Sequence, residues 1–280
     1  MSIITLITDF GYKDHFVAKM KGQIYKKSSN FVDIVNIVDI SHEVSPFNIM
    51  EAAYILQSSF NNFPNGTIHI IDVDSEKNIE NSHIVMVFDS HYFISADNGI
   101  LSILSQNRKA ERIFEINISK PEINNESSID VFTDVACHIA NGGKLGIVGR
   151  EINEIKSLKN LVPFVNKESS QIICSIIYID NFGNVITNLD RTLFNNISKG
   201  RDFEISARNY NFNKIYKKYS DIVNFDLPDS ERNDEGKGLV IFNSNDKLQI
   251  SIYKSNRESV GTASSLMGLK LYDTVTVSFK

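Results

Sequence analysis

The sequence predicts an α/β N-terminal domain with a mostly parallel sheet, followed by a C-terminal antiparallel β-barrel domain. In the first half, short β-branched runs alternate with segments whose apolar residues recur at helical spacing, which is typical of strands joined by crossover helices. In the second half, short apolar runs succeed one another with turn residues between them. A polar linker separates the halves, so we assign residues 1–163 to the first domain and 171–280 to the second.

The elements of the first domain follow from apolar spacing and from residues that can cap helices. Apolar residues at helical spacing predict a helix from residue 16. Asn48, with Glu51 three residues later, predicts the start of a second helix, and Asp130 is the expected cap of a third. Asp89-Ser90-His91 separates two apolar runs and predicts a hairpin. The expected strands are 3–8, 31–40, 67–72, 84–88 and 92–95.

The second domain is expected to consist of short strands. Residues 210–235 are polar and lack a clear period, which indicates a long excursion rather than regular structure. The expected strands are 172–179, 185–188, 203–207, 239–242, 248–253 and 275–279.

Composition narrows the class of protein. Of the 280 residues, 42% are hydrophobic and 22% are charged, as in ordinary globular proteins. The net charge of −5 comes without a basic stripe, which argues against nucleic acid as a partner. No apolar run reaches the roughly 20 residues that cross a bilayer, so no membrane partner is expected. Cys137 and Cys174 lie far apart in apolar runs, and we expect reduced, buried thiols in a cytoplasmic protein.

The triplet Asp9-Phe10-Gly11 resembles the magnesium-binding motif of protein kinases. A kinase places a glycine-rich loop, a strand lysine and a catalytic loop before that motif. Only eight residues of the sequence precede Asp9, which is too few for these parts. A kinase is therefore not expected.

Carboxylates at the ends of predicted strands are the informative residues. Asp9, Asp72, Asp74 and Asp180 each follow an apolar strand-like run. Ligands of open α/β sheets bind beyond the carboxyl ends of the strands, and a carboxylate there can accept hydrogen bonds from the diol of a ribose. For any one of these residues, capping of the following turn is the alternative.

Seven sequence blocks, in order along the chain, resemble the S-adenosylmethionine hydroxide adenosyltransferases, a family related to fluorinases and chlorinases. The blocks span nearly the whole chain. They are Thr8-Asp9-Phe10-Gly11, Asp39-Ile40-Ser41-His42 with Pro46-Phe47, Pro64-Asn65-Gly66-Thr67-Ile68-His69, Ala96-Asp97-Asn98-Gly99, Asp130-Val131-Phe132, Tyr178-Ile179-Asp180-Asn181-Phe182-Gly183-Asn184 and Phe242-Asn243-Ser244.

The resemblance implies a homotrimer that holds S-adenosylmethionine (SAM) between the N-terminal domain of one subunit and the C-terminal domain of its neighbour. It implies that Asp9 binds the ribose hydroxyls and that Phe47 packs against the ligand. Packing in the protein core is the alternative for Phe47. No cofactor is implied, because SAM is the substrate.

The resemblance also places residues of the second domain at the ligand. Asp180 and Asn184 would contact the methionine portion. Phe182 would lie on the adenine side, with core packing as the alternative. Ser244 and the segment that begins at Tyr253 would complete this part of the site.

The set of three catalytic residues that the resemblance implies is altered in this chain. The family uses Asp, Arg and His around the attacking water. The Asp position falls on Asp74, the Arg position on Asn81 and the His position on Ser127. His69 and His83 lie near in sequence and are considered as substitutes. Ser128 stands where fluorinases carry a halide-contacting serine, although a serine in this polar stretch is more commonly part of a loop.

A metal site is not expected. A calcium-binding EF-hand loop that began at Asp72 would need Gly at position 77 and Glu at position 83. Lys77 and His83 occupy those positions. No paired Cys or His spacing indicates zinc either.

The expected function is hydrolysis of SAM to adenosine and methionine by attack of water on the 5′ carbon of the ribose. The alternative, favoured by the loss of Arg and His, is a sensor that binds SAM or a nucleoside without turnover. The presence or absence of released adenosine separates the two.

Overall fold

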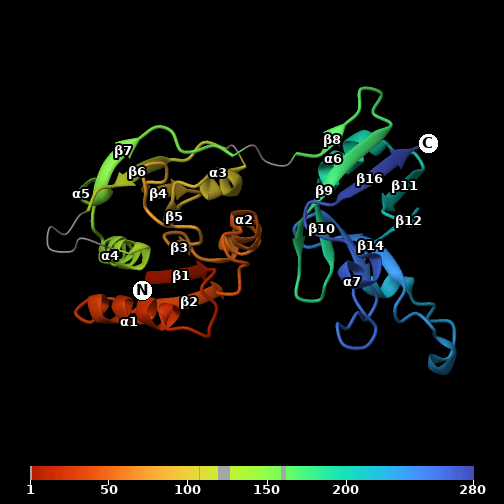
Figure 1. Cartoon of the computed structure of the whole chain (residues 1–280), viewed down its shortest axis with the longest axis horizontal. Coiled ribbons are helices and arrows are strands. Elements are labelled where there is room, and N and C mark those ends of the chain that lie inside the picture. The colour runs from red at the N-terminus through yellow and green to blue at the C-terminus, as the bar shows by residue number, and fades with distance from the viewer. Residues whose placement is uncertain (1, 107, 119–126, 159–161) are drawn as a thin grey trace. The chain divides into compact units, whose positions relative to one another are not determined.

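The chain contains two units that are each described by themselves. A computed structural model describes residues 2–106, 108–118, 127–158 and 162–280. Contacts between residues divide the chain into a unit of residues 1–160, here the N-terminal unit, and a unit of residues 161–280, the C-terminal unit (Figure 1).

A seven-stranded mixed sheet forms the centre of the N-terminal unit. Its order is β2-β1-β3-β5-β4-β6-β7. The first three neighbouring pairs are parallel, and the remaining three are antiparallel. The predicted α/β fold with parallel strands is therefore confirmed, with an antiparallel extension at one edge. The strands are β1 (Ser2–Thr8), β2 (Val35–Ser41), β3 (Ile68–Asp72), β4 (His83–Phe88), β5 (His91–Ala96), β6 (Arg112–Ile116) and β7 (Gly149–Ile152).

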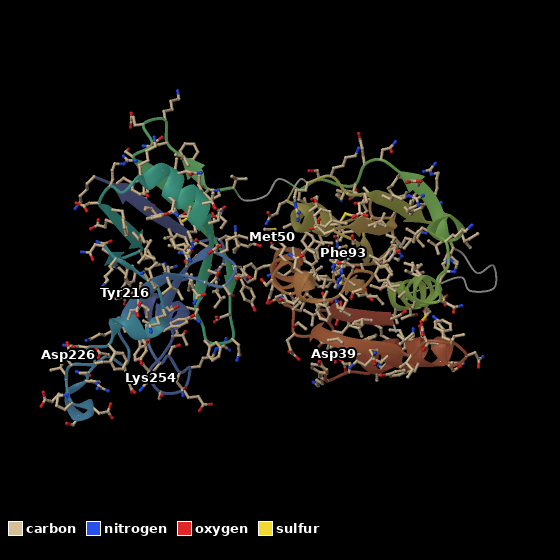
Figure 2. The ribbon with its side chains drawn as sticks, turned by 180° about the vertical axis from the view of Figure 1, so that it is seen from behind. Asp39, Met50, Phe93, Tyr216, Asp226 and Lys254 are labelled. Atoms are coloured by element: carbon tan, nitrogen blue, oxygen red, sulfur yellow. The ribbon has the colours of Figure 1, made fainter. Side chains whose placement is uncertain are left out.

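Helices cover both faces of this sheet. Because side chains alternate along a strand, Ile4 and Leu6 of β1 face one side and Ile7 faces the other. Figure 1 shows α1 and α4 on the first side and α2 and α3 on the second, and Phe93 lies inside this unit in Figure 2. The helices are α1 (Phe16–Ser28), α2 (Ile49–Gln57), α3 (Ile100–Ser105), α4 (Ser128–Ala140) and α5 (Leu145–Val148), with a 3-10 turn at Phe60–Asn62.

Local capping chemistry explains where two helices begin. Asn48 caps α2 as predicted, since its side chain accepts a hydrogen bond from the backbone N–H of Glu51. The prediction that Asp130 caps α4 was wrong. Ser127 is the N-cap, and Asp130 is at position N3 of a capping box, where its carboxylate accepts from the backbone N–H of Ser127.

The predicted hairpin at Asp89-Ser90-His91 is confirmed. It joins β4 to β5 through Asp89 and Ser90, which both have positive φ, as tight hairpin turns require. The run 31–40 is shorter as a strand than predicted, because β2 begins only at Val35.

The C-terminal unit is built on a nine-stranded sheet. Its path runs β12-β11-β16-β9-β10-β15-β14-β13, and β8 pairs with β9. All pairs are antiparallel except β13–β14. The antiparallel sheet is confirmed, whereas closure into a barrel stays a prediction. The strands are β8 (Phe164–Val165), β9 (Gln171–Ile179), β10 (Val185–Asp190), β11 (Phe203–Ala207), β12 (Tyr210–Phe212), β13 (Ile215–Tyr216), β14 (Gly238–Phe242), β15 (Lys247–Ile252) and β16 (Thr274–Phe279).

Two helices in this unit were not predicted. They are α6 (Arg191–Ser198) and α7 (Ala263–Met267). The stretch 210–235 is more structured than predicted, since it contains β12, β13 and 3-10 turns at Tyr219–Ile222 and Asp229–Glu231.

Both cysteines are free and buried, as predicted, and burial raises the pKa of Cys137 to about 11. Across the described parts of the chain, no helix is long and apolar enough to pass through a membrane.

Candidate active site

A cleft opens in the N-terminal unit at the carboxyl ends of the parallel strands β1 and β3. Its volume is about 540 Å³. Ligands of α/β sheets bind at this edge. The cleft brings together five of the predicted site residues, namely Asp9, Phe47, Asp74, Ser127 and Ser128. The other lining residues are Phe10, Asp72, Ser75, Glu76 and Lys77.

Asp9 holds the loop that carries Phe47. One carboxylate oxygen, Oδ2, accepts a hydrogen bond of 2.8 Å from the backbone N–H of Phe47. Phe47 has a φ of +62°, a strained conformation for a residue other than glycine. Its side chain is 72% exposed, so core packing does not account for it. A large apolar ring is thus presented at the cleft, next to a carboxylate with acceptor capacity left over.

A hydrogen-bond network around His42 fixes the backbone on both sides of Asp9. Thr8 shares a hydrogen bond of 2.8 Å with His42, and the backbone N–H of Gly11 donates to the carbonyl of His42. His42 lies 3.1 Å from Asp39, which also pairs with Lys21. Asp39 is labelled in Figure 2. Burial opposes ionisation of Asp39, but hydrogen bonds from Lys21 and His42 outweigh burial and lower its pKa.

Side chains outside the cleft hold the turn after β3 in place. Asp74 has a φ of +49° and is exposed at the cleft. Asn98 donates from its side-chain amide to the carbonyls of Val73 and Asp74, both at 3.0 Å. His83 contacts the carbonyl of Ser75 through Nε2 at 2.9 Å. The positions of Asp74 and its neighbours therefore depend on groups outside the cleft.

Asp72 is the most buried carboxyl group of the cleft, with 2% of its surface exposed. Its Oδ2 atom is buried and has no hydrogen-bond partner among the described residues. Burial raises the pKa of Asp72 to about 7, and the charge of Asp9 acts in the same direction. The hydroxyls of Ser128 and Ser75 partly oppose this shift. Near neutral pH, the protonated and the ionised form of this group are therefore both populated.

Ser127 lies at the cleft, but its hydroxyl belongs to the cap of α4. It donates to Oδ2 of Asp130 at 2.6 Å and accepts from Lys19 at 3.3 Å. Burial opposes ionisation of Asp130, but hydrogen bonds from Ser127, Gln23 and Lys19 hold its pKa well below the usual range. Ser127 thus stabilises the helix start that presents Ser128 to the cleft.

The structure does not bring Asn81, His69 or His83 into the cleft lining. The side-chain oxygen of Asn81 accepts from Lys156 at 3.1 Å. His69 is buried between Thr5 and His91, and burial lowers its pKa to about 3. His83 supports the turn after β3. Neither histidine lines the described cleft, so its geometry does not favour either as the substitute for the missing one.

Lys77 lines the cleft and was missed as a site residue in the sequence. It stands three positions after Asp74, whereas the family Arg is expected seven positions after it. Asp72 was identified as a strand-end carboxylate but was not assigned to the site. The end of a predicted strand was the available signal for Asp72, while nothing in the sequence distinguished Lys77 from a surface lysine.

In the C-terminal unit, Asp180 and Asn184 build the turn between β9 and β10. The carboxylate of Asp180 accepts from the backbone N–H groups of Phe182 and Asn184, both at 2.9 Å, and from the side-chain amide of Asn184 at 2.8 Å. Gly183 has a φ of +72° and packs against Thr262. This turn presents Phe182, which is 65% exposed, so core packing does not explain Phe182 either.

The other predicted residues of this unit lie in different places. Ser244 is exposed in the turn between β14 and β15. Tyr253 lines a separate hollow with Phe225, Arg232 and Lys254. Ser255, two residues further on, donates its hydroxyl to the carbonyl of Phe182 at 3.2 Å. The segment after Tyr253 is therefore joined to the Asp180 turn, while Ser244 and Tyr253 line no common cleft with it in the described structure.

Family models match both units of the chain. The SAM hydroxide adenosyltransferase N-terminal domain matches residues 4–149, and the C-terminal domain of the same family matches residues 174–276. The chain belongs to the SAM hydroxide adenosyltransferase family. The resemblance seen in the sequence is thereby confirmed.

Individual proteins that resemble this chain agree with its assignment to the SAM hydroxide adenosyltransferase family. A protein of Methanocaldococcus jannaschii named (R)-S-adenosyl-L-methionine hydrolase is 26% identical over all of this chain and 97% of its own length. A fluorinase of an Actinoplanes species is 23% identical over 68% of this chain and 72% of its own. The crystal structure of an uncharacterized conserved protein from Thermotoga maritima matches with a TM-score of 0.80, at 28% identity and 99% coverage of each chain.

The pKa of Asp72 yields a prediction about stability. Its pKa is about 7 in the folded chain and 3.8 ordinarily, so the folded state holds an extra proton between these values. The contribution of Asp72 to stability is therefore present below pH 4 and is lost as the pH rises through 7. Relative to Asp72→Asn, wild type should lose about 2–3 kcal/mol between pH 5 and pH 8 in urea unfolding. A difference that stays constant with pH would contradict this account.

Proposed function

We propose that this protein hydrolyses SAM to adenosine and methionine through attack of water on the 5′ carbon of the ribose. The observation that carries the proposal is the cleft that joins Asp9 and Asp74, in a chain whose two units both match the family. The relative from Methanocaldococcus jannaschii, which aligns over the whole chain, carries the name of this activity.

The movement of charge in the reaction suits a cleft rich in carboxylates. The sulfonium sulfur loses its positive charge as it leaves, and the attacking water gains positive charge as its oxygen bonds to carbon. Carboxylates on the side of the water therefore stabilise the transition state more than the ground state. Asp74 is placed in this role. The sulfonium is a good leaving group, so the leaving sulfur needs no acid, and we propose a reaction without a resident cofactor.

Lys77 supplies a cation to the cleft, whereas Asn81, which stands at the family's Arg position, lies outside the cleft lining. We place its ammonium group where it orients the carboxylates of Asp74 and Glu76. At the His position, Ser127 keeps the start of α4 in place. The loss of Arg and His thus leaves a cleft that still contains charged groups on either side of Asp74.

Substrate binding is assigned to Asp9 and Phe47. The carboxylate of Asp9 accepts hydrogen bonds from the two ribose hydroxyls while it keeps its bond to the backbone of Phe47. The exposed ring of Phe47 then covers apolar surface of the ligand. Ser128 lies at the start of α4, next to the position of the attacking water.

Replacing Asp9 by Ala should weaken binding of SAM and of adenosine by about 10- to 100-fold. The reason is that hydrogen bonds to a charged group contribute about 1.5–3 kcal/mol. Isothermal titration calorimetry measures both dissociation constants. As a control, 2′,3′-dideoxyadenosine, which lacks the diol, should lose less affinity than adenosine in Asp9→Ala, because only the support that Asp9 gives to the Phe47 loop is then removed. Equal affinity of both proteins for adenosine would refute the assignment.

We further propose a cytoplasmic homotrimer in which the C-terminal unit of a neighbouring copy completes each cleft. The exposed rings of Phe47 and Phe182 support this arrangement, since large apolar side chains at a ligand site usually become covered. In this arrangement Asp180 and Asn184 shape the turn that delivers Phe182, and Ser244 and Tyr253 lie on the same neighbouring unit. Sedimentation that finds monomers alone, with and without SAM, would contradict this assembly.

The competing function is a sensor that binds SAM without turnover. Purified protein incubated with SAM should release adenosine and methionine in equal amounts, measured by chromatography against a sample without protein. Saturable binding with no adenosine above that background would favour the sensor and reject the enzyme.

A further inference from the structure

The buried carboxyl group of Asp72 has no part in the reaction as described so far. It lines the cleft, and its Oδ2 atom has no hydrogen-bond partner among the described residues. Leaving a buried polar atom unpaired costs about 1–3 kcal/mol, and such atoms in native proteins commonly serve a ligand or a reaction. β3 holds Asp72 rigidly, as the last residue of a fully buried strand.

We propose that Asp72 accepts the proton that the attacking water releases. This inference rests on the proposed function. A lone pair of the water oxygen forms the bond to the 5′ carbon, and the bond from that carbon to sulfur breaks with its electron pair moving to sulfur. One proton of the water passes to the hydroxyl of Ser128 as that hydroxyl passes its own proton to the buried carboxylate of Asp72, and the proton leaves to solvent after adenosine departs. Methionine is released as a neutral thioether, so atoms and charges balance.

The other carboxylates of the cleft are less suited to this step. Asp9 is engaged with the backbone of Phe47 and with the diol. Asp74 is exposed, and in the proposed reaction it already stabilises the attacking water. A base works best when its pKa lies near the working pH. Burial brings the pKa of Asp72 to about 7 and so meets this condition.

The charged surroundings of Asp72 come from three elements. Asp9 follows β1, and its charge raises the pKa of Asp72. The segment after β3 contributes Asp74, Glu76 and Lys77. The start of α4 contributes the uncharged hydroxyls of Ser127 and Ser128, since its carboxylate, Asp130, is engaged by Lys19 and Gln23. Ser128 is within reach of Asp72 and can relay the proton.

The test is the pH dependence of turnover in wild type, Asp72→Asn and Asp97→Asn. Asp97 is a matched control, because burial also raises its pKa but it lies outside the cleft lining. Asparagine at 97 still accepts the hydrogen bond from the backbone N–H of Lys156. Initial rates at saturating SAM from pH 5 to pH 9, with the dissociation constant of SAM at each pH, give kcat apart from binding.

Wild type and Asp97→Asn should both lose turnover below about pH 7, about tenfold per pH unit, as the base becomes protonated. Asp72→Asn should lower kcat by about 100-fold or more, remove this acid limb, and leave the affinity for SAM within a few-fold of wild type. A variant that merely disturbed packing would keep the wild-type pH dependence.

Two failures are distinguishable. No adenosine from wild type would overturn the proposed function and this inference with it. Turnover by wild type, with an unchanged rate and acid limb in Asp72→Asn, would overturn the inference alone. If circular dichroism shows that Asp72→Asn does not fold, the pH dependence of wild-type turnover tests the proposal instead. An acid limb near pH 7 supports the proposal, and a flat profile down to pH 5 overturns it.

Discussion

The candidate active site depends on the register of one parallel strand pair. Thr8 of β1 lies opposite Asp72 of β3, so Asp9 and Asp72 emerge at the same edge of the sheet. A slip of one residue would turn every side chain of the strand to the opposite face. The register is fixed because Ile4, Leu6 and Ile70 fill the space under α1 and α4. The apolar core thus determines which carboxyl groups meet in the cleft, and it makes one of them a group that titrates near neutrality.

Hydrogen bonds from neighbouring side chains hold the two strained residues of the cleft in place. Phe47 and Asp74 both have positive φ, which costs about 1–3 kcal/mol for each residue and persists only where the surroundings enforce it. Asp9 binds the backbone of Phe47, and Asn98 binds the carbonyl of Asp74. Site residues fixed in this way need little rearrangement when the ligand arrives, which favours precise placement of a water molecule.

Much of the fold could be predicted because the signals were local. The cap at Asn48, the hairpin at Asp89 and the strand periods depend only on neighbouring residues, and the structure agrees with them. Helix α3 could not be found in this way. All six of its residues are buried, so it has no amphipathic period. Asp130 was taken for a cap because the sequence does not distinguish the N-cap residue of a capping box from the residue at position N3.

The candidate site was predicted less completely than the fold. Motifs located Asp9, Phe47, Asp74 and Ser128, and the structure brings them into one cleft. Alignment by position selected Asn81, but the path of the turn after β3 brings Lys77 to the cleft instead. The importance of Asp72 lies in its burial and in its unpaired oxygen. Both depend on tertiary packing, so they cannot be inferred from the position of Asp72 at the end of a predicted strand.

The central claim is that water attacks the 5′ carbon of SAM within this cleft. Running the reaction in heavy-oxygen water and analysing the products by mass spectrometry tests it most directly. The account predicts that the heavy oxygen appears in the 5′ hydroxyl of adenosine and that methionine remains unlabelled. Unlabelled adenosine, or a product in which the bond from the 5′ carbon to sulfur is intact, would contradict it.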